Sequence, residues 1–206
     1  HSATHLLHQA LKDVLGAHIK QMGSLVTDEY LRFDFPHFKK LDKGEIKQIE
    51  KIVNSKIKES SKVEVLVDIP ITEAEKIPNV KMFFGDTYGE KVRVIKMGNG
   101  FSAELCGGTH VSETGDIGIF KIIKEESISS GVRRIFAKTG NGVINLMKDN
   151  FNQIENELKS FPEKYTSEAA NELKILKTKF DIINPKDTAS LEEIFDAQDD
   201  LFSKIE

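Results

Sequence analysis

Two short motifs carry donor atoms suited to a transition metal. His1 and His5 are four residues apart at the start of an expected helix, so their imidazoles project from one face, about one turn apart. Cys106 and His110 flank a turn in which two glycines let the backbone fold back on itself. Three imidazoles and one thiolate suit tetrahedral zinc, whereas calcium and magnesium prefer oxygen ligands. The motifs therefore predict a site for Zn²⁺.

Other interpretations of the histidines are open at this point. Helical metalloproteases also place two histidines four residues apart, with a glutamate between them as the general base. Ser2 to Thr4 contain no carboxylate, which disfavours a metal-dependent peptidase. The alternative to a metal site is a buried cysteine with surface histidines, and His8, His18 and His37 are assigned to that alternative.

The elements that must position these motifs are short strands and a few helices. Apolar residues recur at helical spacing over 3–15 and 42–58, and Asp42 is a good N-cap for the second helix. Strands are predicted over 31–35, 63–69, 80–84, 91–97, 101–105, 118–124 and 132–137, with a short helix over 71–76. Runs of strands with segregated helices predict an α+β fold, with an antiparallel sheet packed against helices.

The character of the chain changes near residue 140. Residues 143–206 are rich in Lys, Glu, Asp and Leu with helical periodicity, which predicts a helical appendage. Pro162 and Pro185 interrupt this segment, because proline removes a backbone donor and clashes inside a helix. The prediction is therefore two domains, 1–140 and 141–206.

Composition limits the class of protein and its compartment. A chain of 206 residues with 39% hydrophobic residues can bury one substantial core and a smaller element. No apolar stretch is long enough to span a membrane, and the single cysteine fits a reducing compartment, so we expect a cytoplasmic protein. The net charge of −4 gives no domain-wide basic footprint for nucleic acid. The chain begins at His1 without an initiating methionine, which favours a fragment.

Six motifs, in this order, resemble the editing region of alanyl-tRNA synthetases. They are HSATHLLH at the start, QMGSLV at 21–26, LRFDFPHF at 31–38, ELCGGTHV at 104–111, TGDIGIFKI at 114–122 and SSGVRRIFAKTG at 129–140. The resemblance covers about residues 1–140, and HSATH with CGGTH is its most specific part. The editing domain of threonyl-tRNA synthetases is similar in fold and zinc ligands, but its second motif usually lacks the GGT turn.

The resemblance implies a hydrolytic site. His1, His5, Cys106 and His110 would hold zinc, and Gln21 would line the editing pocket. The implied activity is hydrolysis of the ester in tRNA(Ala) that carries serine or glycine, an aminoacyl-tRNA hydrolase activity within an alanine-tRNA ligase. The domain that activates alanine with ATP is not part of this chain.

Selection of the wrong amino acid needs a polar contact. A small apolar pocket rejects a hydroxylated analogue by only about a hundredfold, which makes a second, hydrolytic site worthwhile. The resemblance implies that the first motif, which contains Thr4, recognises the amino-acid side chain, so Thr4, Gln21 and Cys106 are the expected catalytic residues. The backbone N–H groups of the GGT turn are candidates for stabilising an oxyanion.

The chain departs from the family's sequence pattern at two places. Phe136 stands where the family commonly has glutamate, and the segment after 142 resembles the helical dimerisation linker only loosely. A homodimer through these helices is one expectation. Arg133 and Arg134 point to opposite faces of a strand, so at most one contacts tRNA phosphate, and ion pairing within the fold is the equal alternative. The competing functions are a non-catalytic, zinc-stapled tRNA-binding module and a free-standing aminoacyl-tRNA deacylase.

Overall fold

The computed structural model describes residues 1–82, 88–161 and 163–205. Their backbone forms two compact units, His1–Thr139 and Gly140–Glu206. The first unit carries all of the motifs above and has the α+β architecture predicted from the sequence. The second unit is helical throughout.

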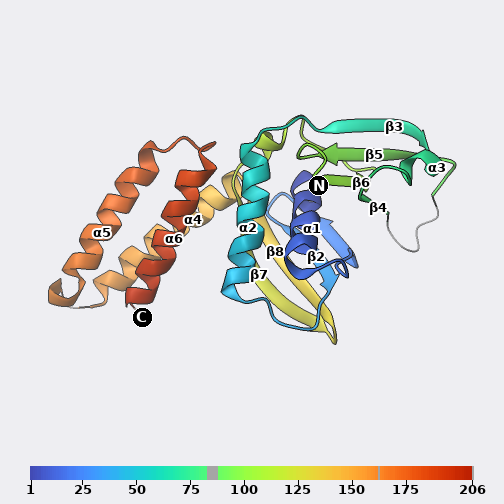
Figure 1. Cartoon of the computed structure of the whole chain (residues 1–206). Helices are drawn as coiled ribbons and strands as arrows, with labels where there is room; N and C mark the ends of the chain where they lie inside the picture. The colour runs from blue at the N-terminus through green and yellow to red at the C-terminus, as the bar shows by residue number, and fades with distance from the viewer. Residues whose placement is uncertain (83–87, 162, 206) are drawn as a thin grey trace. The chain divides into compact units, whose positions relative to one another are not determined.

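The first unit contains two four-stranded sheets and two long helices (Figure 1). Its elements are α1 (Ser2–Leu15), β1 (Gly23–Val26), β2 (Leu31–Pro36), α2 (Lys43–Lys58), β3 (Glu64–Pro70), α3 (Ile71–Ala74), β4 (Val80–Lys81), β5 (Lys91–Met97), β6 (Ser102–Leu105), the 3₁₀ turn η1 (Thr114–Ile117), β7 (Phe120–Ser129) and β8 (Val132–Thr139).

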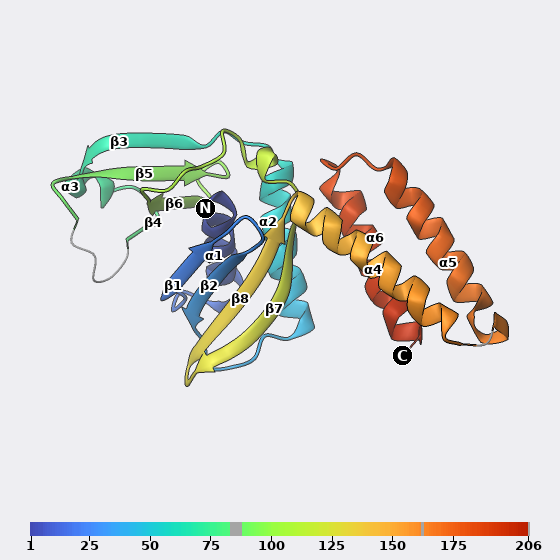
Figure 2. The same cartoon turned by 180° about the vertical axis from the view of Figure 1, so that it is seen from behind.

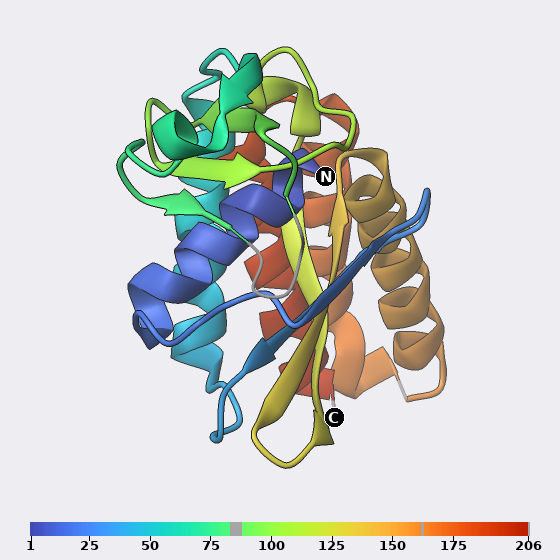
Figure 3. The same ribbon diagram turned by 90° about the vertical axis from the view of Figure 1, so that its right-hand side faces the viewer.

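The first sheet has the antiparallel order β1-β2-β8-β7 (Figure 2). Helices α1 and α2 lie on one face of it (Figure 3). Leu7 and Leu11 of α1 are fully buried with Phe33 and Phe35 of β2, which confirms the apolar face predicted for 3–15. This packing fixes the helix that begins with the two histidines.

Side chains of α2 form hydrogen bonds with backbone groups on the free edge of β7, the last strand of the first sheet. Asn54 donates from Nδ2 to the Phe120 carbonyl at 3.0 Å and accepts the Phe120 N–H at Oδ1 at 2.8 Å. Glu50 accepts the Ile122 N–H at 2.8 Å. Asp42 caps α2 as predicted, in a reciprocal capping box with Glu45. The first part of the β7 edge, at Phe120 and Ile122, is thereby paired with a helix rather than left open for another strand.

The second sheet has the order β3-β5-β6-β4, with β4 parallel to β6 and the other pairs antiparallel. The strand predictions therefore differ from the structure in three respects: there are two sheets, β1 was not predicted, and β4 is a parallel edge. The predicted strand over 80–84 is described only in part, because residues 83 and 84 lie outside the described residues.

The second unit is a three-helix bundle of α4 (Asn141–Lys159), α5 (Glu163–Ile182) and α6 (Thr188–Ile205). Met147 and Phe151 of α4 are buried with Leu201 of α6, and the buried Gln198 donates to the Met147 carbonyl at 2.9 Å. Pro185 lies between α5 and α6, as a helix-breaking residue should. No helix of the described chain has the length and apolar character needed to cross a membrane.

Candidate metal centre and adjoining cavity

The fold brings the two histidine-containing motifs together. The start of α1 lies against β6, the strand that leads into the turn at 106–110 (Figure 1). His5, Cys106 and His110 each offer one ligand atom, and these atoms lie within 4.8 Å of one another. The His5 and His110 ring centroids are 4.7 Å apart. This is the only such cluster of His, Cys, Asp and Glu side chains in the part of the chain that the structure describes.

The unpaired atoms of this cluster fit a cation. His5 Nδ1 and His110 Nε2 are buried and have no hydrogen-bond partner among the described residues. On the opposite side of the rings, Ser2 Oγ lies 3.1 Å from His110 Nδ1, and Glu104 Oε2 lies 3.7 Å from His5 Nε2. Such outer partners fix the orientation of a ligating imidazole and leave the other nitrogen for the metal. Two nitrogens and one thiol sulfur are a donor set that suits zinc.

The electrostatics keep both imidazoles neutral, the form that binds a metal. Burial lowers the pKa of His5. Burial, followed by the repulsion that a protonated His5 would exert, lowers the pKa of His110 to about 4. Protons therefore do not compete for these nitrogens near neutral pH.

His1, the fourth expected ligand, lies beside this cluster and is exposed. Its ring centroid is 6.0 Å from that of His110, and its imidazole rests where a side chain on Gly108 would be. The three-residue cluster does not include it. A glycine at 108 is therefore needed for His1 to approach the turn.

A buried ionic network behind the metal cluster was missed by the sequence analysis. Glu104 is 1% exposed, and its carboxylate lies 3.1 Å from both His8 Nδ1 and Lys81 Nζ. Ser102 Oγ accepts from Lys81 at 3.1 Å and donates to the His5 carbonyl at 3.3 Å. Burial opposes ionisation of Glu104, but the hydrogen bond from His8 and the charges of His5 and Lys81 outweigh it and lower its pKa to about 2. The network anchors β6 and β4 to the helix that carries His5.

Arg93 holds the turn that carries the cysteine. Its guanidinium donates to the carbonyls of Cys106 at 2.9 Å and Gly108 at 2.6 Å, and the Gly108 N–H donates to Cys106 Sγ at 3.3 Å. Space beside Gly107 is open, with no atom within 4 Å of where its Cβ would stand. The turn is therefore fixed in shape and accessible at Gly107.

A cavity of about 480 Å³ joins the metal cluster to the two other expected site residues. Thr4, Gln21 and Cys106 line it together with His1 and His5. Thr4 is buried, and its Oγ1 has no hydrogen-bond partner among the described residues. The structure thus places Thr4, Gln21 and Cys106 around one space, and the hydroxyl of one of these residues, Thr4, is buried without a partner among the described residues.

The remaining singled-out residues have structural partners. His18 Nε2 and His37 Nδ1 lie 3.1 Å apart in a stacked pair. Arg134 binds both carboxylate oxygens of Asp34, at 2.7 and 2.8 Å, and Arg133 donates to a buried glutamate on β7. Both arginines are therefore ion-paired within the fold.

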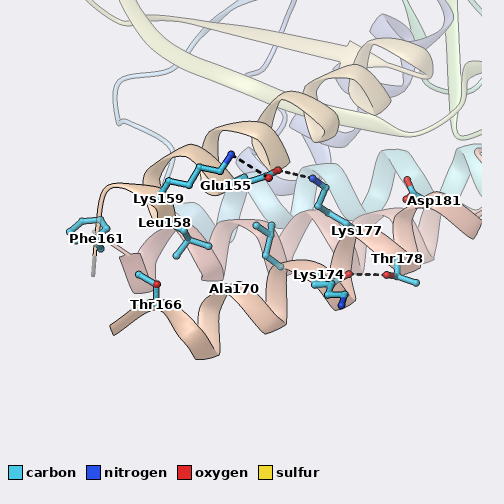
Figure 4. A pocket seen from close by; sticks show the side chains of 11 residues that line it. Glu155, Leu158, Lys159, Phe161, Thr166, Ala170, Lys174, Lys177, Thr178 and Asp181 are labelled. Atoms are coloured by element: carbon cyan, nitrogen blue, oxygen red, sulfur yellow. Dashed lines mark hydrogen bonds and ion pairs between the residues drawn. The ribbon is translucent and has the colours of Figure 1, made fainter. Parts of the chain in front are cut away.

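The helical unit holds a different cavity, of about 620 Å³, between α4 and α5 (Figure 4). The Glu155 carboxylate lies 2.9 Å from Lys177 Nζ and 3.5 Å from Lys159 Nζ. Thr178 Oγ1 donates to the Lys174 carbonyl at 2.9 Å. Its described lining residues include no histidine or cysteine. Although this cavity is larger than the one at the metal cluster, its described lining residues include fewer side chains that could bind a metal or act as a nucleophile.

Comparisons with known proteins show which family the sequence resembles. Residues 92–136 match the threonyl and alanyl tRNA synthetase second additional domain. The alanine-tRNA ligase of Saccharophagus degradans is 52% identical over 167 residues, which cover 79% of this chain and 19% of that protein. The enzyme of the same name from Bacillus subtilis is 48% identical over 172 residues, which cover 80% of this chain and 19% of the relative.

The chain belongs with the alanine-tRNA ligases. This agrees with the motif resemblance and favours the alanyl over the threonyl branch. A further relative, the alanine-tRNA ligase of Porphyromonas gingivalis, is 45% identical over 180 residues, 82% of this chain and 20% of its own length. The chain spans about a fifth of the length of these relatives.

Proposed function

We propose that the unit His1–Thr139 is a zinc-dependent editing domain that hydrolyses the ester of tRNA(Ala) carrying serine or glycine. The observation that carries this proposal is the cavity in which the unpaired Thr4 hydroxyl adjoins the cluster of His5 and Cys106. The relatives support an aminoacyl-tRNA as the substrate class, because they are alanine-tRNA ligases.

His5, Cys106 and His110 would hold the zinc, with His1 as the fourth ligand after a side-chain movement. Bound zinc supplies Lewis-acid polarisation of the ester in such a site. Ser2 supports the role of His110, because its oxygen accepts the Val111 N–H at 3.2 Å and has a second lone pair for His110 Nδ1–H. That tautomer leaves the Nε2 lone pair of His110 for the metal.

Thr4 would recognise the hydroxyl of a misattached serine. Its Oγ1 is buried and unpaired, so a serine hydroxyl in the cavity would satisfy it. Alanine has no such group and would leave Oγ1 without a partner, at a cost of about 1–3 kcal/mol. The Thr4 contact would therefore select serine over alanine, whereas glycine, which also lacks a hydroxyl, would gain nothing from it.

Gln21 and the cysteine turn would position the rest of the ester. Gln21 lines the cavity, and its amide can both donate and accept hydrogen bonds. This suits contact with the hydroxyls of the terminal ribose or with the α-ammonium group of the amino acid. The space beside Gly107 is open, and the backbone N–H of this residue would donate to the developing oxyanion. Arg93 maintains the shape of the turn through the two carbonyls that it binds.

The test is deacylation of seryl-, glycyl- and alanyl-tRNA(Ala) by the zinc-loaded chain. We expect seryl- and glycyl-tRNA to be hydrolysed and alanyl-tRNA to be spared, with all activity lost in Cys106→Ala. In Thr4→Val, the preference for serine over alanine should fall by about tenfold or more. A zinc-loaded chain that binds tRNA but hydrolyses none of the three esters would instead establish a non-catalytic, zinc-stapled binding module.

The helical unit would serve as the linker and dimerisation segment, in a cytoplasmic protein. Ile175 and Ile182 of α5 are 49% and 81% exposed, which is a large apolar exposure for one helix face and supports burial against a second copy. Light scattering of the wild type and of an Ile175→Lys, Ile182→Lys variant tests this. A wild-type monomer would contradict the proposal.

A further inference from the structure

One wall of the cavity at the metal cluster is basic. This wall is formed by β5, from which Lys91 and Arg93 both line the cavity. The two residues are two positions apart in a strand, so their side chains project from the same face. No aspartate or glutamate occurs among the described residues that line this cavity. The side chains of this wall therefore present positive charge to whatever the cavity holds.

Neither of these two cations is neutralised by a carboxylate. The Arg93 guanidinium donates to two backbone carbonyls, those of Cys106 and Gly108, and to no carboxylate in the part of the chain that the structure describes. Lys91 is exposed, and its ammonium group has no ion pair or hydrogen bond with any described side chain. By contrast, Lys96 of the same strand lies 2.9 Å from the Glu64 carboxylate. A cavity wall with unpaired positive charge attracts an anion.

The order of groups along this wall matches the order of groups in an aminoacylated nucleotide. Arg93 binds the turn that carries Cys106, and Lys91 lies two residues further from that turn, at the exposed start of β5. In an aminoacyl-tRNA, the ester and the 5′ phosphodiester of the terminal adenosine are attached to the same ribose. A nucleotide whose ester lies at the metal cluster can therefore set this phosphodiester against Lys91.

We propose that Lys91 binds the phosphodiester on the 5′ side of the terminal adenosine of tRNA, and that the charge of Arg93 strengthens this contact. This inference rests on the proposed function, because it takes the ester to lie at the metal cluster. A lysine ammonium group binds phosphate as a point charge and positions a nucleic acid without reading its sequence. Lys91 thus holds the part that all substrates share, whereas Thr4 contacts the amino acid that distinguishes them.

The experiment compares three acceptor minihelices of tRNA(Ala) that end in CCA and carry no amino acid. The first has natural phosphodiesters, the second has one uncharged methylphosphonate on the 5′ side of the terminal adenosine, and the third has the same modification inside the double-stranded stem. Dissociation constants are measured by fluorescence anisotropy over a range of salt. The proteins are the wild-type chain, Lys91→Met, Lys91→Arg and Lys51→Met. Lys51 is exposed on α2 and does not line the cavity, so it is the matched control.

The wild type should bind the natural minihelix several-fold more tightly than the one with the terminal methylphosphonate. This preference should disappear in Lys91→Met and persist in Lys51→Met and in Lys91→Arg, which keeps the charge. Lys91→Met should also lower the slope of log K against log salt by about 0.7. The effect of the stem modification should be the same in all four proteins. The cycle isolates one contact, because a general loss of affinity would affect all three minihelices equally.

A kinetic measurement gives an independent readout. In Lys91→Met, the KM for hydrolysis of seryl-tRNA(Ala) should rise several-fold with kcat little changed, because a contact to a phosphate that does not react is equally strong in the ground state and the transition state. An equal fall in kcat and kcat/KM would instead assign Lys91 to the reaction itself and contradict a binding role.

Three binding results would overturn the proposal: no preference of the wild type for the charged terminal linkage, a preference that persists in Lys91→Met, or no binding of the natural minihelix. Inorganic phosphate is titrated as a competitor. Lys91-dependent displacement by it, without a preference between linkages, would establish a free-anion site instead.

Failure of the proposed function is distinguishable from failure of this inference, because the minihelices carry no ester. A linkage preference that depends on Lys91, without hydrolysis of seryl-tRNA(Ala), supports the phosphate contact and removes the editing activity. Hydrolysis with an unchanged KM in Lys91→Met removes the phosphate contact alone.

Discussion

Substitution of Asn54 tests whether side chains of α2 stabilise the fold by binding the edge strand β7. Its amide bridges α2 to both backbone groups of Phe120 on the edge strand β7, and it is only 2% exposed. Asn54→Ala would leave a buried N–H and a buried C=O without partners. Each orphaned group costs about 1–3 kcal/mol. Alanine favours the helix over asparagine by about 0.5 kcal/mol, which offsets part of the loss.

The expected net loss in the free energy of unfolding is about 3 kcal/mol, or a fall of about 10 °C in melting temperature for a unit of this size. The assay is urea unfolding followed by far-UV circular dichroism, since the chain has no tryptophan. Hydrogen exchange of the peptide over 120–129 gives a local readout, because opening of the β7 edge should accelerate its amides first.

Two matched variants sharpen the result. Asn54→Asp keeps an acceptor for the Phe120 N–H but sets a carboxylate oxygen against the Phe120 carbonyl in a buried site, so we expect a loss at least as large as for alanine. Gln48→Ala removes an exposed amide from the same helix and should change stability by less than about 0.5 kcal/mol. If Asn54→Ala is indistinguishable from Gln48→Ala, the reasoning that helix side chains complete the strand edge is wrong.

Three further predictions concern the metal, a helix cap and a turn. EDTA should lower the melting temperature of the zinc-loaded chain, and Cys106→Ser should abolish this response; an equal response in both would exclude the thiol as a ligand. Asp42→Ala should lower the free energy of unfolding at neutral pH, and this loss should shrink as the pH falls below 3.8. The backbone hydrogen bond from Glu45 lowers the pKa of Asp42, so the stabilising carboxylate is lost on protonation. A difference in the free energy of unfolding between wild type and variant that stays constant down to acid pH would refute this. Gly131→Ala should cost about 1–2 kcal/mol in urea unfolding, since φ is +72° there and a Cβ would stand 2.8 Å from the Phe38 ring; an unchanged midpoint would show that the turn adapts.

The spacing of residue types along the chain predicts the long helices, most of the strands and the three residues of the metal cluster. Apolar spacing over 3–15 predicts α1 because a 3.6-residue period places those side chains on one face. Asp42 predicts the start of α2 because its carboxylate can accept the free N–H groups of the first turn. The roles of Thr4 and Gln21 came from the family resemblance, since their residue types alone do not distinguish them from other polar residues.

Only the tertiary structure decided what surrounds these residues. All four residues of β6 are buried, so the alternation that separates two faces gives no signal for Glu104. Its partners Lys81 and His8 are 23 and 96 positions away in the chain, and the strand order that assembles them is not encoded in local periodicity. The same holds for Arg93, whose contact with the cysteine turn depends on the pairing of β5 with β6. Local spacing fixes elements through nearest-neighbour sterics, whereas which strands pair, and which charged groups they bury together, is settled by the packing of the whole unit.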